Sequence, residues 1–220
     1  MNQQDHWDNV YQTKDSASVS WYAPSLETSL QLIQQLAPNP DAAILDIGSG
    51  AATLADDLLA AGYANVSLLD ISAHALLITQ QRLGVKAEQI RWLVGNVLEI
   101  DLPPNHYDVW HDRAVFHFLT EEADRQRYVQ QVLRAVKPAG HVIMATFGEQ
   151  GPKQCSGLDV MRYDATALHG EFGRSFRLLD SLTVNHQTPA GAVQQFLYCY
   201  CRVEGVNVLP NEPITTPIRQ

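Results

Sequence analysis

The sequence predicts an α/β domain with a doubly wound, mostly parallel sheet that ends in an antiparallel strand. Apolar, strand-like runs alternate with helix-like segments between residues 42 and 147. The runs are almost continuously apolar, which is typical of parallel strands covered by helices on both faces. Two later runs, 174–186 and 193–203, are joined by a short segment with Pro and Gly and indicate an antiparallel hairpin at one edge.

Composition and charge set limits on the class of protein. The 220 residues suffice for one sizeable domain, and 45% hydrophobic with 18% charged residues is typical of a globular protein. A net charge of −9 argues against binding to nucleic acid or an anionic membrane, since both need cationic patches. No secretory signal or membrane-spanning run is evident. We therefore expect a cytoplasmic protein, monomeric or homodimeric, with reduced cysteines.

The chain divides into three expected parts. Residues 1–40 form a polar leader with several aromatic residues, and its helix, 25–36, places apolar side chains on one face. Residues 41–204 form the α/β domain, and residues 205–220 are a loose tail rich in proline.

Within the α/β domain, caps and glycines delimit the expected elements. Ser72 and Thr120 are expected to cap helices, Gly62 and Gly84 to end them, and residues 137–140 to form a turn. The expected elements in chain order are strand 42–48, helix 52–62, strand 65–71, helix 72–83, strands 90–95 and 107–113, a helix after Thr120, strand 141–147, a helix near 164–172 and the final hairpin.

A glycine-rich stretch, DIGSG, follows the first strand and opens a helix. Gly48 and Gly50 let the backbone approach a ligand, and the helix N-terminus offers free N–H groups. Asp70 stands twenty residues after Gly50, at the end of the second strand, where a carboxylate can accept bonds from both hydroxyls of a ribose. A dinucleotide site would have a third glycine at the position of Thr53. The pattern predicts a ligand with an adenosine-like ribose.

The stretch resembles motif I of class I S-adenosylmethionine (SAM)-dependent methyltransferases, with Ala52 in place of the last motif glycine. The resemblance covers about residues 40–203. It implies a Rossmann-like, seven-stranded sheet with SAM as cofactor and S-adenosylhomocysteine (SAH) as product. It also implies that Asp46 holds the methionine end, although a charge partner for the helix N-terminus is an alternative role. Other expected cofactor contacts are Gly48, Gly50, Asp70, Ile71, Asn96, Val97, His111, Trp21 and Tyr22.

The segment after the fourth strand, HDRAVFHFL, is implied by the resemblance to lie beside the transferred methyl group. His117, Asp112 and Arg113 are the catalytic candidates, with His117 as a base because histidine titrates near neutral pH. Equally, Phe116 and His117 could belong to the core, and Asp112 could pair with Arg113. No metal site is expected, because no cysteine or carboxylate completes a ligand spacing with His111 and His117.

The aromatic leader and a later loop supply the expected acceptor site. The leader resembles the N-terminal lid of thiopurine- and thiol-methylating enzymes and the leader of certain protein-lysine methyltransferases. Aromatic rings attract a sulfonium cation, although the same rings could simply cover the sheet. The loop 148–163 lies at the ligand-binding edge of the predicted sheet. Expected substrate contacts are Tyr11, Lys14, Phe116, Cys155, Arg162 and Tyr163.

These observations predict an enzyme that methylates a small nucleophile, with a thiol, sulfide or related chalcogen favoured. A protein-lysine N-methyltransferase and an inactive SAM-binding regulatory module are the alternatives. A thiol acceptor calls for a closed aromatic pocket, whereas a protein acceptor calls for an open, acidic rim around the methyl group.

Overall fold

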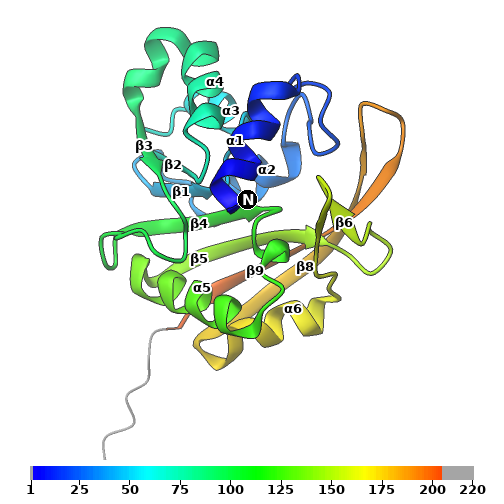
Figure 1. The fold of residues 1–220 in the computed structure, drawn as a ribbon. Helices are drawn as coiled ribbons and strands as arrows, with labels where there is room; N and C mark the ends of the chain where they lie inside the picture. The colour runs from blue at the N-terminus through cyan, green and yellow to red at the C-terminus, as the bar shows by residue number, and fades with distance from the viewer. Residues whose placement is uncertain (1, 205–220) are drawn as a thin grey trace, which may run out of the picture.

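A seven-stranded sheet forms the centre of the molecule (Figure 1). The computed structural model describes residues 2–204, so the predicted tail lies outside the described residues. The strand order is β3-β2-β1-β4-β5-β9-β8. The strands are β1 (Ala43–Ile47), β2 (Asn65–Asp70), β3 (Ile90–Val94), β4 (Tyr107–Arg113), β5 (Val136–Phe147), β8 (Phe176–Gln187) and β9 (Val193–Val203).

Strands β1 to β5 are parallel, and β9 runs antiparallel to both of its neighbours. The predicted fold class and the C-terminal hairpin are confirmed. The last strand of the chain lies inside the sheet because β9 is almost entirely buried, whereas β8 alternates between covered and exposed positions and forms the edge. The strand order reverses direction between β1 and β4, which opens a crevice at their carboxyl ends.

Helices cover both faces of the sheet, and each face has its own apolar core (Figure 1). Successive residues of β1 illustrate this, since Ile44 packs toward α2, α3 and α4 while Leu45 packs toward α5 and α6. None of the described helices is long and apolar enough to cross a membrane. The helices are α1 (Gln3–Thr13), α2 (Glu27–Leu36), α3 (Leu54–Ala60), α4 (Ala73–Leu83), α5 (Glu122–Ala135) and α6 (Ala165–Phe172). Short 3₁₀ turns follow at η1 (Gly84–Gln89), η2 (Phe116–Phe118) and η3 (Gly173–Ser175), and β6 (Gln154–Cys155) and β7 (Leu158–Asp159) form a small hairpin.

The helix caps and the turn predicted from the sequence were confirmed only in part. Ser72 caps α4, because its hydroxyl accepts a hydrogen bond from the Ala75 N–H at 3.2 Å. The prediction for Thr120 was wrong, since α5 starts later and its N-cap, Glu121, makes no side-chain capping bond. The predicted turn at 137–140 belongs to β5, where Ala139 adopts a positive φ of 64°.

Helix α1 was not predicted from the sequence. It begins at Asn2, whose side chain accepts a hydrogen bond from the Asp5 N–H at 2.7 Å. Only Val10 and Tyr11 of this helix are buried, so it lacks the broad apolar stripe from which core helices are recognised.

A buried polar chain fixes the turn that follows β4. The Trp110 Nε1–H donates to the Tyr128 hydroxyl at 2.8 Å, and that hydroxyl donates to Asp112 at 2.5 Å. The Asp112 carboxylate also accepts from the backbone N–H groups of Val115, at 2.8 Å, and Phe116, at 3.1 Å. Helix α5 is thereby tied through Tyr128 to the segment that forms one wall of the crevice.

Replacing Tyr128 with Phe should lower the free energy of unfolding by about 1–3 kcal/mol, because Asp112 loses a donor and the indole N–H of Trp110 loses its acceptor. Chemical denaturation would measure the change. Tyr107→Phe is the matched control, since the Tyr107 hydroxyl is buried without a partner in the described part of the chain. Equal losses in both variants would contradict a role for the polar chain.

Candidate functional site

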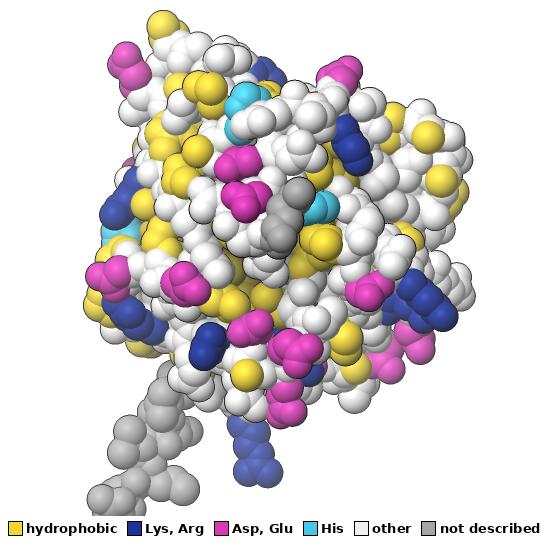
Figure 2. Space-filling model, in the orientation of Figure 1, with side chains coloured by type: hydrophobic (Ala, Val, Ile, Leu, Met, Phe, Trp, Pro, Cys, Tyr) yellow, Lys and Arg dark blue, Asp and Glu magenta, His cyan; other side chains and the backbone are white. Residues whose placement is uncertain are grey.

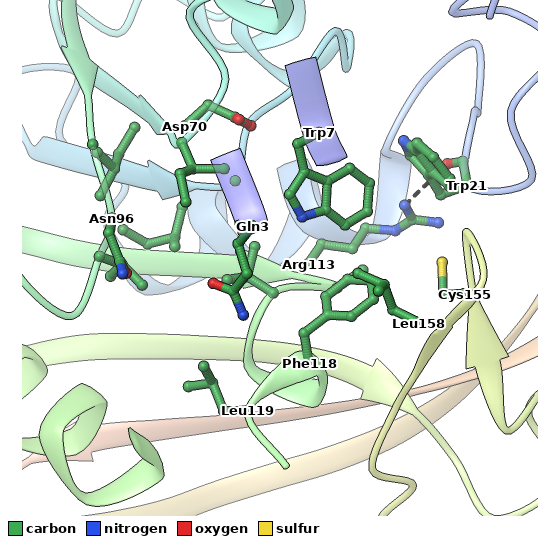
Figure 3. A pocket seen from close by; sticks show the side chains of 18 of the residues that line it. Gln3, Trp7, Trp21, Asp70, Asn96, Arg113, Phe118, Leu119, Cys155 and Leu158 are labelled. Carbon is green, nitrogen blue, oxygen red and sulfur yellow. Dashed lines mark hydrogen bonds between the residues drawn. The ribbon is translucent and has the colours of Figure 1, made fainter. Parts of the chain in front are cut away.

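A cavity of about 330 Å³ lies in the crevice, beneath α1 (Figure 3). Its walls come from the ends of β1, β2 and β4, the segments after β2, β3 and β4, helix α1 and the β6–β7 hairpin. In Figure 3, Asp70 and Asn96 lie at one end, and Arg113, Trp21 and Cys155 lie at the other. The volume is at the low end of the range for small-molecule sites.

The glycine loop after β1 requires glycine for two physical reasons. Gly48 and Gly50 have positive φ angles of 59° and 54°, which other residues rarely adopt. A Cβ on Gly48 would lie 2.0 Å from Val115 Cγ2, and one on Gly50 would lie 2.3 Å from the Tyr11 hydroxyl oxygen. Glycine therefore lets the wall after β4 and helix α1 approach the loop closely. Gly48 lines the cavity, whereas Gly50 lies behind it.

Side chains of α4 hold the carbonyl groups of the same loop. Arg82 donates to the carbonyl oxygens of Ala51, at 2.7 Å, and Ala52, at 2.6 Å. The Thr79 hydroxyl donates to the Gly50 carbonyl at 3.0 Å. These hydrogen bonds could not be predicted from the sequence, because they join residues about thirty positions apart.

Asp70 joins the glycine loop to α4 and lines the cavity. One carboxylate oxygen accepts from the Gly50 N–H and the other from the Ser72 N–H, each at 2.8 Å. Burial raises the pKa of Asp70 to about 6. Each carboxylate oxygen keeps a second lone pair, so the group can still accept hydrogen bonds from the two hydroxyls of a ribose.

The segments after β2 and β3 form the far end of the cavity. Ile71, Asn96 and Val97 line it, as expected from the sequence. The Asn96 side-chain oxygen already accepts from the Leu98 N–H at 3.0 Å, which leaves one lone pair and the amide N–H₂ group. Hydrogen-bonding groups next to the apolar side chains of Ile71 and Leu119 fit a purine base, and Asp70 fits its ribose. The residues present therefore suit an adenosine.

Asp46 and His111 do not line this cavity, contrary to their predicted cofactor contacts. Both are buried, and Asp46 contacts His111 Nδ1 at 2.6 Å. His111 Nε2 lies 2.9 Å from the Ser29 hydroxyl, which lies 3.3 Å from the Tyr198 hydroxyl. This network joins β1, β4, α2 and β9 behind the glycine loop, so Asp46 and His111 support the site rather than contact the ligand. Tyr22 also lies outside the cavity lining.

Two of the predicted catalytic residues, His117 and Asp112, lie outside the cavity lining. His117 is fully buried against Phe118 and Phe147, and its Nδ1 accepts from the Phe147 N–H at 3.4 Å. Burial, assisted by the positive charge of Arg113, lowers the pKa of His117 to about 3. Asp112 is engaged in the turn after β4, and burial raises its pKa to about 6. Neither lines the cavity, and a histidine with so low a pKa is a weak base.

Arg113 is the catalytic candidate that does line the cavity. Its Nη1 donates to the Trp21 carbonyl oxygen at 3.1 Å, and its guanidinium carbon lies 4.3 Å from the ring centroid of Phe196. It does not pair with Asp112, which the sequence had left open.

Aromatic rings close the cavity between its two ends. The ring centroid of Trp7 lies 5.8 Å from that of Trp21, 5.2 Å from that of Phe118 and 6.5 Å from that of Tyr11. Figure 3 shows Trp7 and Phe118 between the Asp70 end and the Arg113 end. Trp7 and Phe118 were visible in the sequence but were not assigned to the site, since only the packing of α1 on the loop after β4 brings them together.

Two of the six predicted substrate residues, Tyr11 and Cys155, line the cavity. Burial raises the pKa of the Cys155 thiol to about 11, so it stays protonated at neutral pH. The other four lie elsewhere, for different reasons. Phe116 and Tyr163 pack together in the core, with ring centroids 6.0 Å apart. Lys14 is exposed at the end of α1, and exposed Arg162 donates to the Glu149 carbonyl at 2.6 Å.

Comparisons with known proteins agree with this geometry. A family model described as a methyltransferase domain matches residues 44–140. A solved structure from a study of the conversion of a disulfide bond into a thioacetal group during echinomycin biosynthesis is similar, with a TM-score of 0.73 and 15% identity over 94% of this chain and 95% of that one. The 1,6-didemethyltoxoflavin-N1-methyltransferase of Burkholderia thailandensis, solved with bound SAH, has a TM-score of 0.68 and 18% identity over 91% of this chain and 86% of that one. Residues 44–140 thus match a methyltransferase domain, and the chain has the fold of class I SAM-dependent methyltransferases.

Two relatives found by sequence are 24% and 21% identical to this chain. The eEF1A lysine and N-terminal methyltransferase of Bos taurus is 24% identical over 140 residues, which cover 63% of this chain. This chain spans 20% of that protein's length. The EEF1A lysine methyltransferase 2 of Homo sapiens is 21% identical over 192 residues, or 81% of this chain and 75% of that protein. The predicted family and its cofactor, SAM, are confirmed by these comparisons together with the fold.

The affinity for SAH should fall at acidic pH, because the ribose hydroxyls need the ionised form of Asp70. With its pKa raised to about 6, the carboxylate is ionised above that pH and protonated below it. The dissociation constant should therefore rise about tenfold for each pH unit below 6. Calorimetry between pH 5 and pH 8 measures this.

The matched control for this titration is Asp70→Asn, which keeps the shape of the side chain and removes its charge. This variant should bind SAH more weakly by about 1.5–3 kcal/mol at pH 8, with little change in affinity as the pH falls. A flat pH profile in the unmodified protein would contradict the role of Asp70.

Proposed function

We propose that the protein transfers the methyl group of SAM to a small acceptor, and that the acceptor is a thiol, sulfide or related chalcogen. The observation that carries this proposal is the acceptor end of the cavity, which is largely aromatic and without a strong base. The domain match and the adenosine-shaped end of the cavity support the cofactor half of the reaction.

The size of the cavity favours a small acceptor. Helix α1, Trp21 and the β6–β7 hairpin form walls of this partly open cavity, and its volume of about 330 Å³ leaves little room for an acceptor beside the cofactor. On the face drawn in Figure 2, acidic and basic side chains are interspersed without a continuous basic surface, which favours a small molecule over nucleic acid as partner.

The three cysteines are free and buried, which supports the proposed cytoplasmic location.

The titratable groups along the cavity favour a thiol over an amine or alcohol. Asp70 is at the adenosine end, the pKa of Cys155 is raised to about 11 by burial, and burial also raises the pKa of Tyr11. The remaining carboxylate, Asp159, is exposed on the hairpin. A thiol supplies a useful fraction of thiolate at neutral pH without a base, whereas amines and alcohols are almost fully protonated there.

The chain contributes binding, alignment and the exclusion of water. Bound SAM supplies an electrophilic methyl group on a sulfonium ion. Asp70 and Asn96 hold the adenosine, and the rings of Trp7, Trp21 and Phe118 offer their π-electrons to positive charge while keeping water out. Because methyl transfer is an in-line displacement, rigid walls that align the acceptor supply most of what it needs.

We propose that residues 1–40 form a lid segment with its helix and that residues 41–204 form the methyltransferase domain. Helix α1 forms part of the cavity wall. It packs on the glycine loop and α4 through Tyr11, through the Trp7 cluster and through Asp8, whose carboxylate accepts from the Ser72 hydroxyl at 2.6 Å. We propose that this helix opens to admit the cofactor and closes for reaction.

A protein-lysine N-methyltransferase is the second candidate, because two of the sequence relatives carry that name. An inactive SAM-binding regulatory module is the third. Turnover with different acceptors separates all three, because the inactive module binds SAH but methylates nothing.

Purified protein with SAM should methylate small thiols at least about tenfold faster than amines, carboxylates or phenols of similar size. The pH at which the rate levels off should follow the pKa of the thiol, so two thiols of different acidity should give two different profiles. Identical profiles would indicate a base on the protein. Methylation of lysine-containing proteins without thiol turnover would favour the second candidate.

Limited proteolysis tests the lid. Trypsin should cut after exposed Lys14, at the end of α1, and saturating SAH should slow this cut at least about tenfold because the closed lid is stabilised. Asp8→Ala should speed the cut by loosening α1. Cleavage after exposed Lys86, in η1, is the internal control and should not respond to SAH. Equal cleavage after Lys14 with and without SAH would show that α1 is a fixed wall.

A further inference from the structure

Arg113 carries the positive charge at the acceptor end of the cavity. Of the described residues that line the cavity, it is the one lysine or arginine. It sits at the end of β4, next to Trp21 and Cys155 in Figure 3, and its side chain is partly buried. Its location differs from that of Arg162, the arginine that was expected from the sequence to contact the substrate, which lies outside the cavity lining.

The guanidinium group of Arg113 has no carboxylate partner. No ion pair involves it within residues 2–204. Its one hydrogen bond among these residues goes from Nη1 to the Trp21 carbonyl, and one face packs on Phe196. A partly desolvated cation with unused N–H donors is costly unless an anion or further acceptors complete its shell.

Within residues 2–204 no neighbouring group balances this charge, since the second carboxylate of the cavity, Asp159, is exposed on the hairpin and forms no ion pair with Arg113. Burial, and then the charge of Arg113, lowers the pKa of both His117 and His186, so both are neutral at pH 7. Burial keeps the Cys155 thiol protonated by raising its pKa to about 11. An anion bound in the cavity would balance this charge and accept hydrogen bonds from the unused N–H groups.

The sheet order places this charge on the acceptor side. The order runs β1-β4-β5-β9, with the glycine loop at the end of β1 and Asp70 beyond it on β2. The guanidinium carbon lies 4.3 Å from the ring centroid of Phe196 on β9, on the opposite side of β4 from β1. Arg113 therefore points away from the adenosine end.

We propose that Arg113 binds a negative charge on the methyl acceptor and so determines its specificity. The proposal rests on the proposed function and narrows it to small thiols that are anionic when bound. The charge is either the thiolate itself or a carboxylate elsewhere in the same molecule. A guanidinium group offers several N–H donors in a fixed plane, which suits a carboxylate with two contacts and a thiolate with one.

The experiment compares 3-mercaptopropionate with its amide, which have similar thiols but differ in charge. kcat/KM is measured for the unmodified protein and for the variants Arg113→Met and Arg113→Lys. The matched control is Arg127→Met, which changes an exposed arginine of α5. If Arg113 binds a carboxylate, kcat/KM of the unmodified protein is at least about tenfold higher for the acid than for the amide. Arg113→Met loses this preference, and Arg113→Lys keeps part of it. If Arg113 binds the thiolate, the two thiols react at the same rate, and Arg113→Met raises the kinetic pKa of both. In either case SAH affinity changes less than twofold.

Three results would overturn the proposal. Arg113→Met could weaken SAH binding tenfold or more without changing the rates of the two thiols relative to each other, which would assign the charge to the methionine end of the cofactor. The variant could leave rates, kinetic pKa and affinity unchanged, which would make Arg113 a packing residue. A higher kcat/KM for the amide than for the acid in the unmodified protein would also exclude the proposal.

A binding measurement separates this proposal from the proposed function. The SAH complex is titrated with 3-(methylthio)propionate and with its amide, neither of which needs turnover. Tighter binding of the acid, lost in Arg113→Met, supports an anion site even where no thiol is methylated, and that result would reject only the thiol acceptor. Equal, weak binding of both molecules together with the absence of thiol turnover rejects both proposals.

Discussion

The carboxylate of Asp70 is the constraint on which the geometry of the site depends. Its two oxygens accept from the N–H groups of Gly50 and Ser72, so it ties the glycine loop after β1 to the first turn of α4. Ser72 in turn caps α4 and donates its hydroxyl to Asp8 of α1. One buried side chain thus connects the loop, the helix and the proposed lid, and it faces the place where a ribose would bind. The proposed movement of α1 would therefore act on the same carboxylate that faces the proposed ribose site.

Strand β4 carries polar support on both faces. His111 points toward α2 and bonds to Asp46 and Ser29, whereas Asp112 points toward α5 and bonds to Tyr128. Buried groups of this kind are costly unless they are satisfied, and here each carboxylate has close partners. Their effect is to hold the ends of β1 and β4 rigidly around the cavity. Rigid walls matter in a reaction that depends on alignment more than on proton transfer.

The cavity combines a polar end, an aromatic middle and a single cation. Asp70 and Asn96 suit an adenosine, the rings of Trp7 and Phe118 lie between the two ends, and Arg113 forms no ion pair within residues 2–204. The position of His117 outside the cavity removes the base that an amine or alcohol acceptor would need. We therefore propose that two properties of the acceptor decide whether it is a substrate. It must ionise without help from a base on the protein, and it must carry a negative charge that Arg113 can bind.

The sequence by itself determined the alternation of strands and helices in the α/β domain, the glycine loop and the identity of Asp70, but not helix α1. These depend on local rules: apolar runs form covered strands, positive φ angles favour glycine, and the end of a parallel strand faces the ligand edge. Tertiary structure alone decided which residues of the segment 111–117 reach the cavity. Side chains alternate along β4, so His111 and Asp112 enter opposite cores, and the 3₁₀ turn after the strand buries His117. Arg113, at the strand end, lines the cavity together with Ala114 and Val115, and packing of Phe196 and Trp21 from distant parts of the chain holds its side chain there.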